Sequence, residues 1–527
     1  MAQIAFILLA HRDPAAVIAQ ARALAAGAEG VAIHYDGRSP PAEYRQIAEA
    51  LAGTQNVAFT PARIRCGWGE WSLVAATLTG LRTALQAFPE ATHLYLVSAD
   101  CAPIKSATFA RGWLGNDPAD HIEAHDFLAS NWIRTGMKEE RLIYRHLFNE
   151  RRAKPLFYAS LDIQRRLRLA RPLPEGLRIM IGSQWWCLRR ATAEAILRFI
   201  AERPDIPRFF RTTWIPDETF FQSLVRHLVP EGEIRNRAPT FTRFTDYGMP
   251  VTFYNDHYDL LLAEDALFAR KISPEATDLR ARLRALWTSG EKDQRTADQV
   301  GRLHAFLTER GRAGQRFAPR FWEAEATLPR HRTLRIVTCK KWHVAQRLVA
   351  AIRRADLMPA HGYIFDDHGS DLPDLGGAAS TLEKRQRHRR ALIDMIYTHY
   401  GSDSLLICVD PKRLDILTDL NATPADIRVL ELQCALSDDW LDGHAMRAGR
   451  TTGATPWATR KALLPAILSE IEDESEAIAK AGLRRLHTLR EGARDTAPDK
   501  ALSLAAFLDI PPPDAAALID GIDLFAD

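Results

Sequence analysis

The sequence lacks several motifs that bind nucleotides or activate a nucleophile. It contains no Gly-x-x-x-x-Gly-Lys-[Ser/Thr] loop, no Gly-x-Ser-x-Gly elbow and no His-Glu-x-x-His zinc motif. His11-Arg12-Asp13 has the letters of a kinase catalytic loop, but Ile18 occupies the position where that loop needs asparagine. Gly67-x-Gly69 is not followed by the third glycine of a dinucleotide-binding fingerprint. These absences exclude a P-loop enzyme and give no support to a kinase or a dinucleotide-dependent enzyme.

Cysteines are few, and no two of them form a Cys-x-x-Cys pair. The six are Cys66, Cys101, Cys187, Cys339, Cys408 and Cys434. This scattered distribution is typical of buried thiols in a reducing compartment, so we expect neither a disulfide framework nor a zinc site.

Long apolar runs and a strong excess of charge are also missing. The run Ile4 to Ala10 is followed at once by His11, and no stretch approaches the roughly 18 apolar residues that a spanning helix needs. The 69 basic and 66 acidic residues leave a net charge of +3, which gives no reason to expect a nucleic-acid partner. We therefore expect a soluble, cytoplasmic protein.

The first part of the chain shows strand-like and helix-like segments in alternation. Apolar strands are predicted at 3–10, 30–35, 57–59 and 93–97, with helices between them at 14–26 and 42–51 and from about 71 to 87. This order predicts an α/β fold with a mostly parallel sheet, in which ligands bind beyond the carboxyl ends of the strands. Asp36 and Asp100 follow two such strands.

The remainder of the 527 residues requires further domains. Residues 276–329 are charged and helical, which indicates a connector. Residues 330–527 alternate again, with strands predicted at 334–339, 362–365, 404–409 and 428–433 and a helix at 382–399. We interpret this part as a smaller accessory α/β domain that ends in helices.

The segment Pro216–Phe221 reads locally as the start of a helix. Pro216 suits an early helical position, and the acidic pair Asp217-Glu218 suits the positive end of the helix dipole. Apolar residues follow at helical spacing, namely Phe220, Phe221, Leu224, Val225 and Leu228. Taken alone, the segment predicts nothing more than a capped helix.

Seven short segments, in order across about residues 1–275, resemble the core-2/I-branching β-1,6-N-acetylglucosaminyltransferase and peptide O-xylosyltransferase family. They are Ile7–Pro14, Ile33–Asp36, Trp68–Leu73, Ser98–Ile104, Gly182–Trp186, Pro216–Phe221 and Leu267–Lys271. The Gly-Ser-x-Trp form of the fifth segment and the basic doublet of the last are more similar to the xylosyltransferase branch.

The resemblance implies a GT-A type domain, residues 1–275, that transfers xylose or N-acetylglucosamine from a UDP-sugar to a glycan hydroxyl with inversion. Glu218 matches the general base, which a helix N-terminus would keep ionised. Arg270 and Lys271 match the cations that bind the diphosphate. Because adjacent residues on a helix do not share a face, we expect this doublet at a turn or a helix end. The sequence has no Asp-x-Asp, so we expect neither a metal nor another cofactor.

Other roles follow from the same resemblance. We expect nucleotide contacts from Ala10, His11, Asp36 and Trp68. We expect contacts with the donor sugar or the acceptor from Asp100, Gln184 and Trp185; Asp100 could instead only hold the loop at Pro103. Trp185 and Trp186 could also be core aromatics, since strand alternation would send only one of the two inward.

The chain departs from the animal members of the family. We expect no Golgi anchor, the disulfide-forming cysteines of those members are missing, and the resemblance does not cover the C-terminal half. These departures suit a bacterial cytoplasmic enzyme of polysaccharide biosynthesis, acting on a glycan or a lipid-linked saccharide. Basic residues gather at Arg165, Arg166, Arg168 and Arg171, which leaves open a solvated face or a face for an acidic acceptor. They gather again at 384–390, which leaves open a solvated face or a contact with an anion or the inner face of a membrane.

Two alternatives to the transferase hypothesis remain at this stage. The chain could be a non-catalytic scaffold for glycan assembly whose transferase domain has decayed. It could also be bifunctional, with a second transferase in the C-terminal half.

Overall fold

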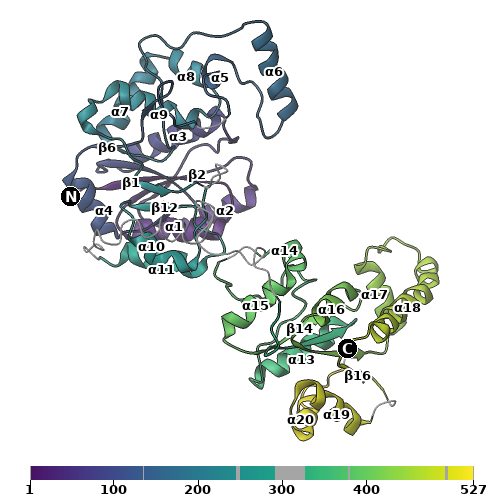
Figure 1. The fold of residues 1–527 in the computed structure, drawn as a ribbon. Helices are drawn as coiled ribbons and strands as arrows, with labels where there is room; N and C mark the ends of the chain where they lie inside the picture. The colour runs from purple at the N-terminus through teal and green to yellow at the C-terminus, as the bar shows by residue number, and fades with distance from the viewer. Residues whose placement is uncertain are drawn as a thin grey trace. The chain divides into compact units, whose positions relative to one another are not determined.

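The chain forms two compact α/β units, Met1–Ala318 and Pro319–Asp527. The computed structural model (Figure 1) describes residues 2–133, 136–244, 250–290, 327–377, 380–492 and 496–525. All six cysteines are free thiols, as expected.

The first unit is built on a seven-stranded sheet with the order β10-β6-β9-β4-β1-β2-β3. Its strands are β1 (Ile4–Ala10), β2 (Gly30–Tyr35), β3 (Val57–Phe59), β4 (His93–Ser98), β6 (Asp120–His121), β9 (Cys187–Arg189) and β10 (Ile234–Arg235). The strands β1 to β4 are parallel, and β9 runs antiparallel to both of its neighbours. The mostly parallel sheet predicted from the alternation is confirmed. Every position of β2 is buried, as expected for a strand covered on both faces.

Helices surround this sheet (Figure 1). They are α1 (Pro14–Ala26), α2 (Pro41–Leu51), α3 (Trp71–Ala87), α4 (Ala107–Asn116), α5 (Glu140–Ile143), α6 (Lys154–Arg166), α7 (Arg190–Glu202), α8 (Asp205–Phe210), α9 (Phe220–Leu228), α10 (Tyr258–Leu262) and α11 (Thr277–Thr288). The Asp13 carboxylate accepts a hydrogen bond from the Ala16 backbone N–H at 3.1 Å and caps α1 immediately after β1 ends. This cap fixes the direction in which the chain leaves the sheet at His11.

Two smaller sheets complete the first unit. One consists of β11 (Thr240–Thr242), β12 (Phe268–Arg270) and β5 (Ala102–Pro103), and the other of β7 (His125–Asp126) and β8 (Met180–Ile181). β12 lies antiparallel to β5, which brings the 268–270 segment beside the loop that follows Asp100. Its Phe268 packs against Phe6 of β1 at 5.3 Å between ring centroids, so the small sheet is anchored on the large one.

α11 lies within the segment interpreted as a connector, and it packs into the first unit. Its Trp287 ring centroid lies 5.7 Å from that of Phe6 and 5.6 Å from that of Phe268. Most of the predicted connector, residues 291–326, lies outside the described residues.

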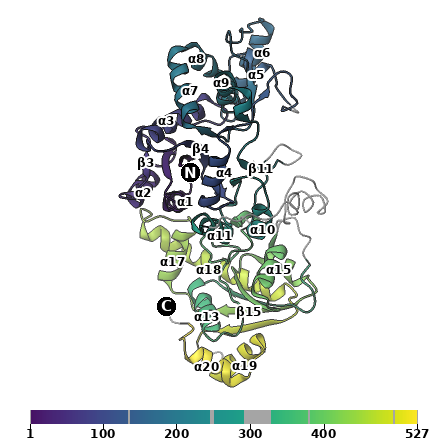
Figure 2. The same ribbon diagram turned by 90° about the vertical axis from the view of Figure 1, so that its left-hand side faces the viewer.

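The second unit contains a four-stranded parallel sheet with the order β14-β13-β15-β16 (Figure 2). Its strands are β13 (Thr333–Cys339), β14 (Ser404–Val409), β15 (Asp426–Gln433) and β16 (Leu486–Arg490). Its helices are α13 (Trp342–Arg354), α14 (Leu382–Arg387), α15 (Arg389–Tyr400), α16 (Leu414–Asn421), α17 (Asp438–Arg447), α18 (Trp457–Lys480), α19 (Ala497–Leu508) and α20 (Pro512–Asp520). The smaller α/β fold is confirmed.

Two predicted elements of this unit are wrong in detail. Residues 362–365 form no strand; they are a buried turn in which the Tyr363 ring stacks on Trp342 at 4.2 Å. The helix predicted at 382–399 is divided at His388 into α14 and α15. Among the described residues, no single helix is long and apolar enough to cross a membrane, and only the bent pair α19 and α20 passes such a test jointly.

Candidate active site

The carboxyl edge of the large sheet places three of the predicted nucleotide contacts together. Ala10 ends β1, and its carbonyl accepts a hydrogen bond from the Asp36 backbone N–H at 2.9 Å. The carbonyl of the exposed His11 accepts one from the Ser39 hydroxyl at 2.6 Å. Since β1 and β2 are parallel neighbours, their ends deliver Ala10, His11 and Asp36 to the same place.

The Asp36 carboxylate supports the loop around it. Its Oδ1 accepts hydrogen bonds from the backbone N–H groups of Arg38 at 2.8 Å and Cys66 at 3.2 Å. The Arg63 guanidinium donates to the Asp36 carbonyl at 2.6 Å. Asp36 Oδ1 therefore stabilises the backbone at Arg38 and Cys66. A contact between Asp36 and uridine stays a prediction.

Trp68 lies at a cavity of about 290 Å³, which it lines together with Trp214. The Arg151 guanidinium lies 3.9 Å from the centroid of the Trp68 ring, and Trp214 meets that ring edge-on at 6.2 Å. The Trp68 side chain is 42% exposed, so one side of this cation–π pair faces solvent. Sequence reasoning did not find Arg151 or Trp214.

Glu218 lies in a single 3-10 turn, Pro216–Glu218, and α9 begins only at Phe220. Ile215, just before the turn, has φ 54°, a left-handed conformation that is uncommon for a β-branched residue. Its N–H donates to the Gly69 carbonyl at 3.0 Å, which ties the Trp68 loop to the turn. The segments around Trp68 and Glu218, far apart in sequence, therefore meet.

The turn at residues 182–186 packs against the Glu218 turn. The Gly182 N–H donates to the Glu218 carbonyl at 3.0 Å, and the Gln222 amide donates to the Ser183 carbonyl at 2.8 Å. A Cβ at Gly182 would lie 2.1 Å from the Glu123 carbonyl oxygen, so only glycine fits this approach. A third segment of the predicted site is thus fixed against Glu218.

Glu218 has a cationic partner that the sequence did not indicate. Its Oε2 accepts a hydrogen bond from Arg141 Nη1 at 3.3 Å, and the side chains of Glu218 and Arg141 are 33% and 11% exposed. Burial raises the pKa of Glu218, and the Arg141 charge opposes that rise. Glu218 immediately precedes Thr219, the N-cap of α9, so an effect of the helix N-terminus on its charge stays a prediction. The group that favours the ionised form is Arg141, which lies over the Trp214 ring at 4.9 Å.

The neighbouring carboxyl group, Asp217, also has a raised pKa. Burial, followed by the charge of Glu218, raises the pKa of Asp217 to about 7. Its Oδ1 is buried and has no hydrogen-bond partner among the described residues. A buried oxygen without a donor disfavours the carboxylate, which agrees with the direction of the shift.

This shift predicts how stability depends on pH. Because the pKa of Asp217 is higher in the folded than in the unfolded chain, the folded state binds the extra proton, and the free energy of unfolding falls as the pH rises from about 4 to about 7. For the partly exposed side chain we expect a loss of about 2 kcal/mol, since one pKa unit corresponds to about 1.4 kcal/mol. Asp217→Asn should remove this part of the pH dependence in urea denaturation. Parallel pH profiles of the two proteins would contradict the assignment.

A cluster of cations surrounds Asp100 at the end of β4. Arg12 Nη2 lies 3.4 Å from Asp100 Oδ1, and Lys271 Nζ lies 3.9 Å from Oδ2. Arg270 places its guanidinium over the Trp185 ring at 4.3 Å. Burial and the Arg270 charge lower the pKa of Lys271, and Asp100 opposes this. Two cations thus meet the Asp100 carboxylate, and the Arg270 charge acts on Lys271 beside them, which leaves an excess of positive charge.

We expected the basic doublet at a turn or a helix end, but it lies at the end of a strand. Arg270 is the last residue of β12 and Lys271 follows it. The backbone is held on both sides: the Lys271 carbonyl accepts from the Phe253 N–H at 2.8 Å, and the Ile272 N–H donates to the Asp100 carbonyl at 2.9 Å. The strand end lets one side chain reach Trp185 and the other reach Asp100.

Both Trp185 and Trp186 are buried, contrary to the expectation that only one would point inward. Neither lies in a strand, because β9 begins at Cys187, so alternation does not apply to them. Trp186 packs on Phe221 at 5.1 Å in the core, whereas Trp185 lies under Arg270. The partly buried Gln184 side chain makes no hydrogen bond to a described residue.

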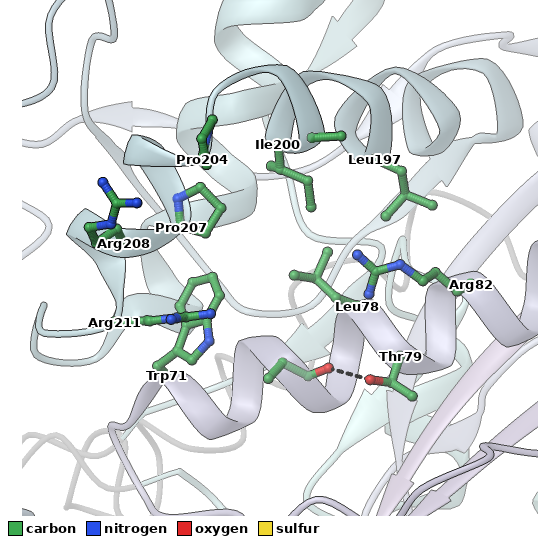
Figure 3. A pocket seen from close by; sticks show the side chains of 12 residues that line it. Trp71, Leu78, Thr79, Arg82, Leu197, Ile200, Pro204, Pro207, Arg208 and Arg211 are labelled. Carbon is green, nitrogen blue, oxygen red and sulfur yellow. Dashed lines mark hydrogen bonds between the residues drawn. The ribbon is translucent and has the colours of Figure 1, made fainter.

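A larger cavity, of about 440 Å³, lies between α3 and the pair α7 and α8 (Figure 3). Figure 3 shows Leu78 and Arg82 of α3 on one side and Leu197 and Ile200 of α7 on the other. None of the predicted site residues lines it. Within the described part of the chain, no group of three or more His, Cys, Asp or Glu side chains is placed to hold a metal ion.

The first unit is an α/β domain with a parallel-rich sheet, and it resembles a glycosyltransferase by its family match. The family model described as Core-2/I-Branching enzyme matches residues 4–258. This match confirms the predicted resemblance of the N-terminal half. It supports sugar transfer from a nucleotide-sugar donor to a glycan acceptor as the general activity.

Other comparisons add less. A family of unknown function (DUF5928) matches residues 270–527. No curated protein matches the chain. One similar solved structure is the apo-form glycosyltransferase GlyE of Streptococcus pneumoniae TIGR4, with 8% identity and a TM-score of 0.22 over 89% of this chain and 99% of that one. At this TM-score the likeness supports no further conclusion.

Proposed function

We propose that the first unit is an inverting glycosyltransferase that passes xylose or N-acetylglucosamine from a UDP-sugar to a hydroxyl of a glycan or a lipid-linked saccharide. The observation that carries this proposal is the pairing of Arg12 and Lys271 with Asp100 at the carboxyl edge of a parallel sheet, with the adjacent Arg270 over Trp185. A leaving UDP gains negative charge, and fixed cations stabilise that charge in the transition state.

Glu218 is the base in this proposal. It takes the proton from the acceptor hydroxyl while that oxygen attacks the anomeric carbon, and UDP leaves with the electron pair of the broken bond. The Arg141 guanidinium, 3.3 Å from Glu218 Oε2, favours the ionised form that a base needs. Arg270 and Lys271 face the diphosphate and supply the positive charge that many related enzymes take from a metal.

The experiment that tests the proposal is UDP release from a panel of UDP-sugars, with and without EDTA. We expect release from UDP-xylose or UDP-N-acetylglucosamine, at the same rate in EDTA, because the cations belong to the chain. A strict requirement for manganese would contradict the metal-free assignment. No release from any donor, with a range of glycan acceptors, would favour the non-catalytic scaffold.

No described feature of the second unit favours a second transferase. At the carboxyl ends of β13 and β14, the Lys340 ammonium is engaged by Glu474 at 2.7 Å and Asp410 at 3.4 Å. The Trp342 indole N–H donates to Asp410 Oδ2 at 2.8 Å. These groups satisfy one another, and we propose an accessory role for this unit.

A further inference from the structure

The segment 147–173, which contains α6, exposes an unusual number of large apolar side chains. Eight of the 17 large hydrophobic residues that are exposed in the described chain lie in it. They are Leu147, Phe148, Leu156, Tyr158, Ile163, Leu167, Leu169 and Leu173. Isolated exposed apolar residues need no explanation, but a concentration of them marks an interaction surface.

α6 carries two apolar stripes, and only one of them packs against the protein. Phe157 and Leu161 are buried on the inner side. Leu156, Ile163 and Leu167, the last of them the C-cap residue, recur at positions i, i+7 and i+11, so they share a side of the helix distinct from the buried one, and all three are exposed. The helix lies at the outer margin of the first unit in both views (Figure 1, Figure 2). The outer stripe therefore contributes nothing to the core.

Positive charge accompanies this stripe. Residues 145–170 contain seven basic residues, Arg145, Arg151, Arg152, Lys154, Arg165, Arg166 and Arg168, against two acidic ones, Glu150 and Asp162. Arg165 pairs with Glu140 and Asp162. Arg152, Lys154, Arg166 and Arg168 form no ion pair with a described residue. Their charges are available to an anionic partner.

Arg171 does not belong to this surface, although the sequence groups it there. It is buried and donates to the carbonyls of Leu142 at 2.7 Å and Phe209 at 2.9 Å, and to the hydroxyls of Thr212 and Thr213. Its hydrogen bond to the Leu142 carbonyl stabilises the backbone next to Arg141. The interpretation of Arg171 as part of an acceptor-binding face is therefore wrong.

Three arginines of the basic stretch at 384–390 are, like Arg171, engaged within the protein. The buried Arg385 donates to the carbonyls of Ile364 and Asp367, and Arg389 and Arg390 both pair with Asp419. These arginines hold the second unit together. The contrast leaves the α6 segment as the stronger candidate for a basic surface.

We propose that residues 147–169 bind the anionic surface of a lipid bilayer. Leu156, Ile163 and Leu167 enter the boundary between headgroups and acyl chains, while the flanking arginines and Lys154 contact lipid phosphates. The combination of features selects this occupant. A polyanion alone would not use an exposed leucine stripe, and a second copy of this surface would bring like charges together.

The proposed bilayer-binding surface lies next to the cavity beside Trp68. Residues 147–150, at its start, line the smaller cavity beside Trp68. If the proposed function holds, a bilayer at this surface would bring a lipid-linked acceptor to that cavity. The bilayer contact itself does not depend on the proposed reaction.

The test is co-sedimentation of the full chain with vesicles of phosphatidylcholine alone and of equal parts phosphatidylcholine and phosphatidylglycerol. We expect binding to the anionic vesicles only. The triple variant Leu156→Gln, Ile163→Gln, Leu167→Gln should bind them about 100-fold more weakly. The quadruple variant Arg152→Gln, Lys154→Gln, Arg166→Gln, Arg168→Gln should bind about 1,000-fold more weakly.

A matched control replaces Leu463 and Leu502, two exposed leucines of the second unit, by glutamine. It should bind like the unchanged protein, and thermal unfolding should show that every variant is folded. The proposal is overturned if the unchanged chain ignores anionic vesicles or if the triple variant binds them equally. It is also overturned if the stripe proves to hold a dimer that the triple variant dissociates. UDP release with a soluble acceptor should be the same in the triple variant, so failure of the proposed function is scored separately.

Discussion

Glu218→Gln is expected to lower the rate of sugar transfer about 1,000-fold, the usual contribution of a general base, while UDP binding stays unchanged. Glutamine has the shape of glutamate and can still meet Arg141, but it cannot take the proton of the acceptor hydroxyl. Because Glu218 lies in the turn tied to Gly69 and Gly182 through the backbone, the substitution leaves those hydrogen bonds in place. Transfer is measured with the donor identified by UDP release, and UDP affinity by calorimetry.

Asp217→Asn provides the matched control, since it makes the same chemical change one residue earlier in the same turn. The Asp217 side chain has a buried oxygen without a hydrogen-bond partner and forms no ion pair with a described residue, so we expect transfer close to that of the unchanged protein. Near-normal turnover of Glu218→Gln would show that the base lies elsewhere. A severe loss in Asp217→Asn with intact Glu218 would exchange the roles of the two carboxyls.

The architecture was predictable where each element carries a local signal. β1 and β2 are apolar at nearly every position because they are buried on both faces, and α1 follows a capping aspartate. The same reasoning failed at 362–365, where Ile364 and Phe365 are buried in a turn. A short apolar run reports burial, and burial alone does not distinguish a strand from a covered loop.

The candidate site was predictable only as a set of short segments. The resemblance singled out Glu218, Trp68 and the doublet, and the structure brings the Trp68 loop and the 182–186 turn against the Glu218 turn. Arg141 could not be found, because it lies 77 residues from Glu218 and no local pattern connects them. The position of Arg270 on a strand could not be predicted either, because β12 is three residues long and depends on its pairing with β5 and β11.

Replacing both cations of the doublet, by Arg270→Met and Lys271→Met, is expected to weaken UDP binding about 1,000-fold, because each charged contact with the diphosphate contributes about 2 kcal/mol. Methionine keeps an unbranched apolar stem over Trp185 and beside Asp100, so the loss reports charge rather than packing. Turnover should fall as well, since the leaving group would lose its stabilising cations. Calorimetric titration with UDP and the UDP-release assay measure the two effects.

The control for this pair comes from the larger cavity between α3 and α8. Arg82→Met with Arg208→Met removes two arginines that line it and that lie outside the predicted site. UDP affinity should not change in this variant. If it falls while the doublet variant binds normally, the diphosphate occupies the larger cavity instead. If both variants bind UDP normally, neither set of cations holds the donor. Loss in the doublet variant alone would place the diphosphate beside Asp100. Arg12 remains there, with its Nη2 3.4 Å from Asp100 Oδ1, and would account for residual affinity.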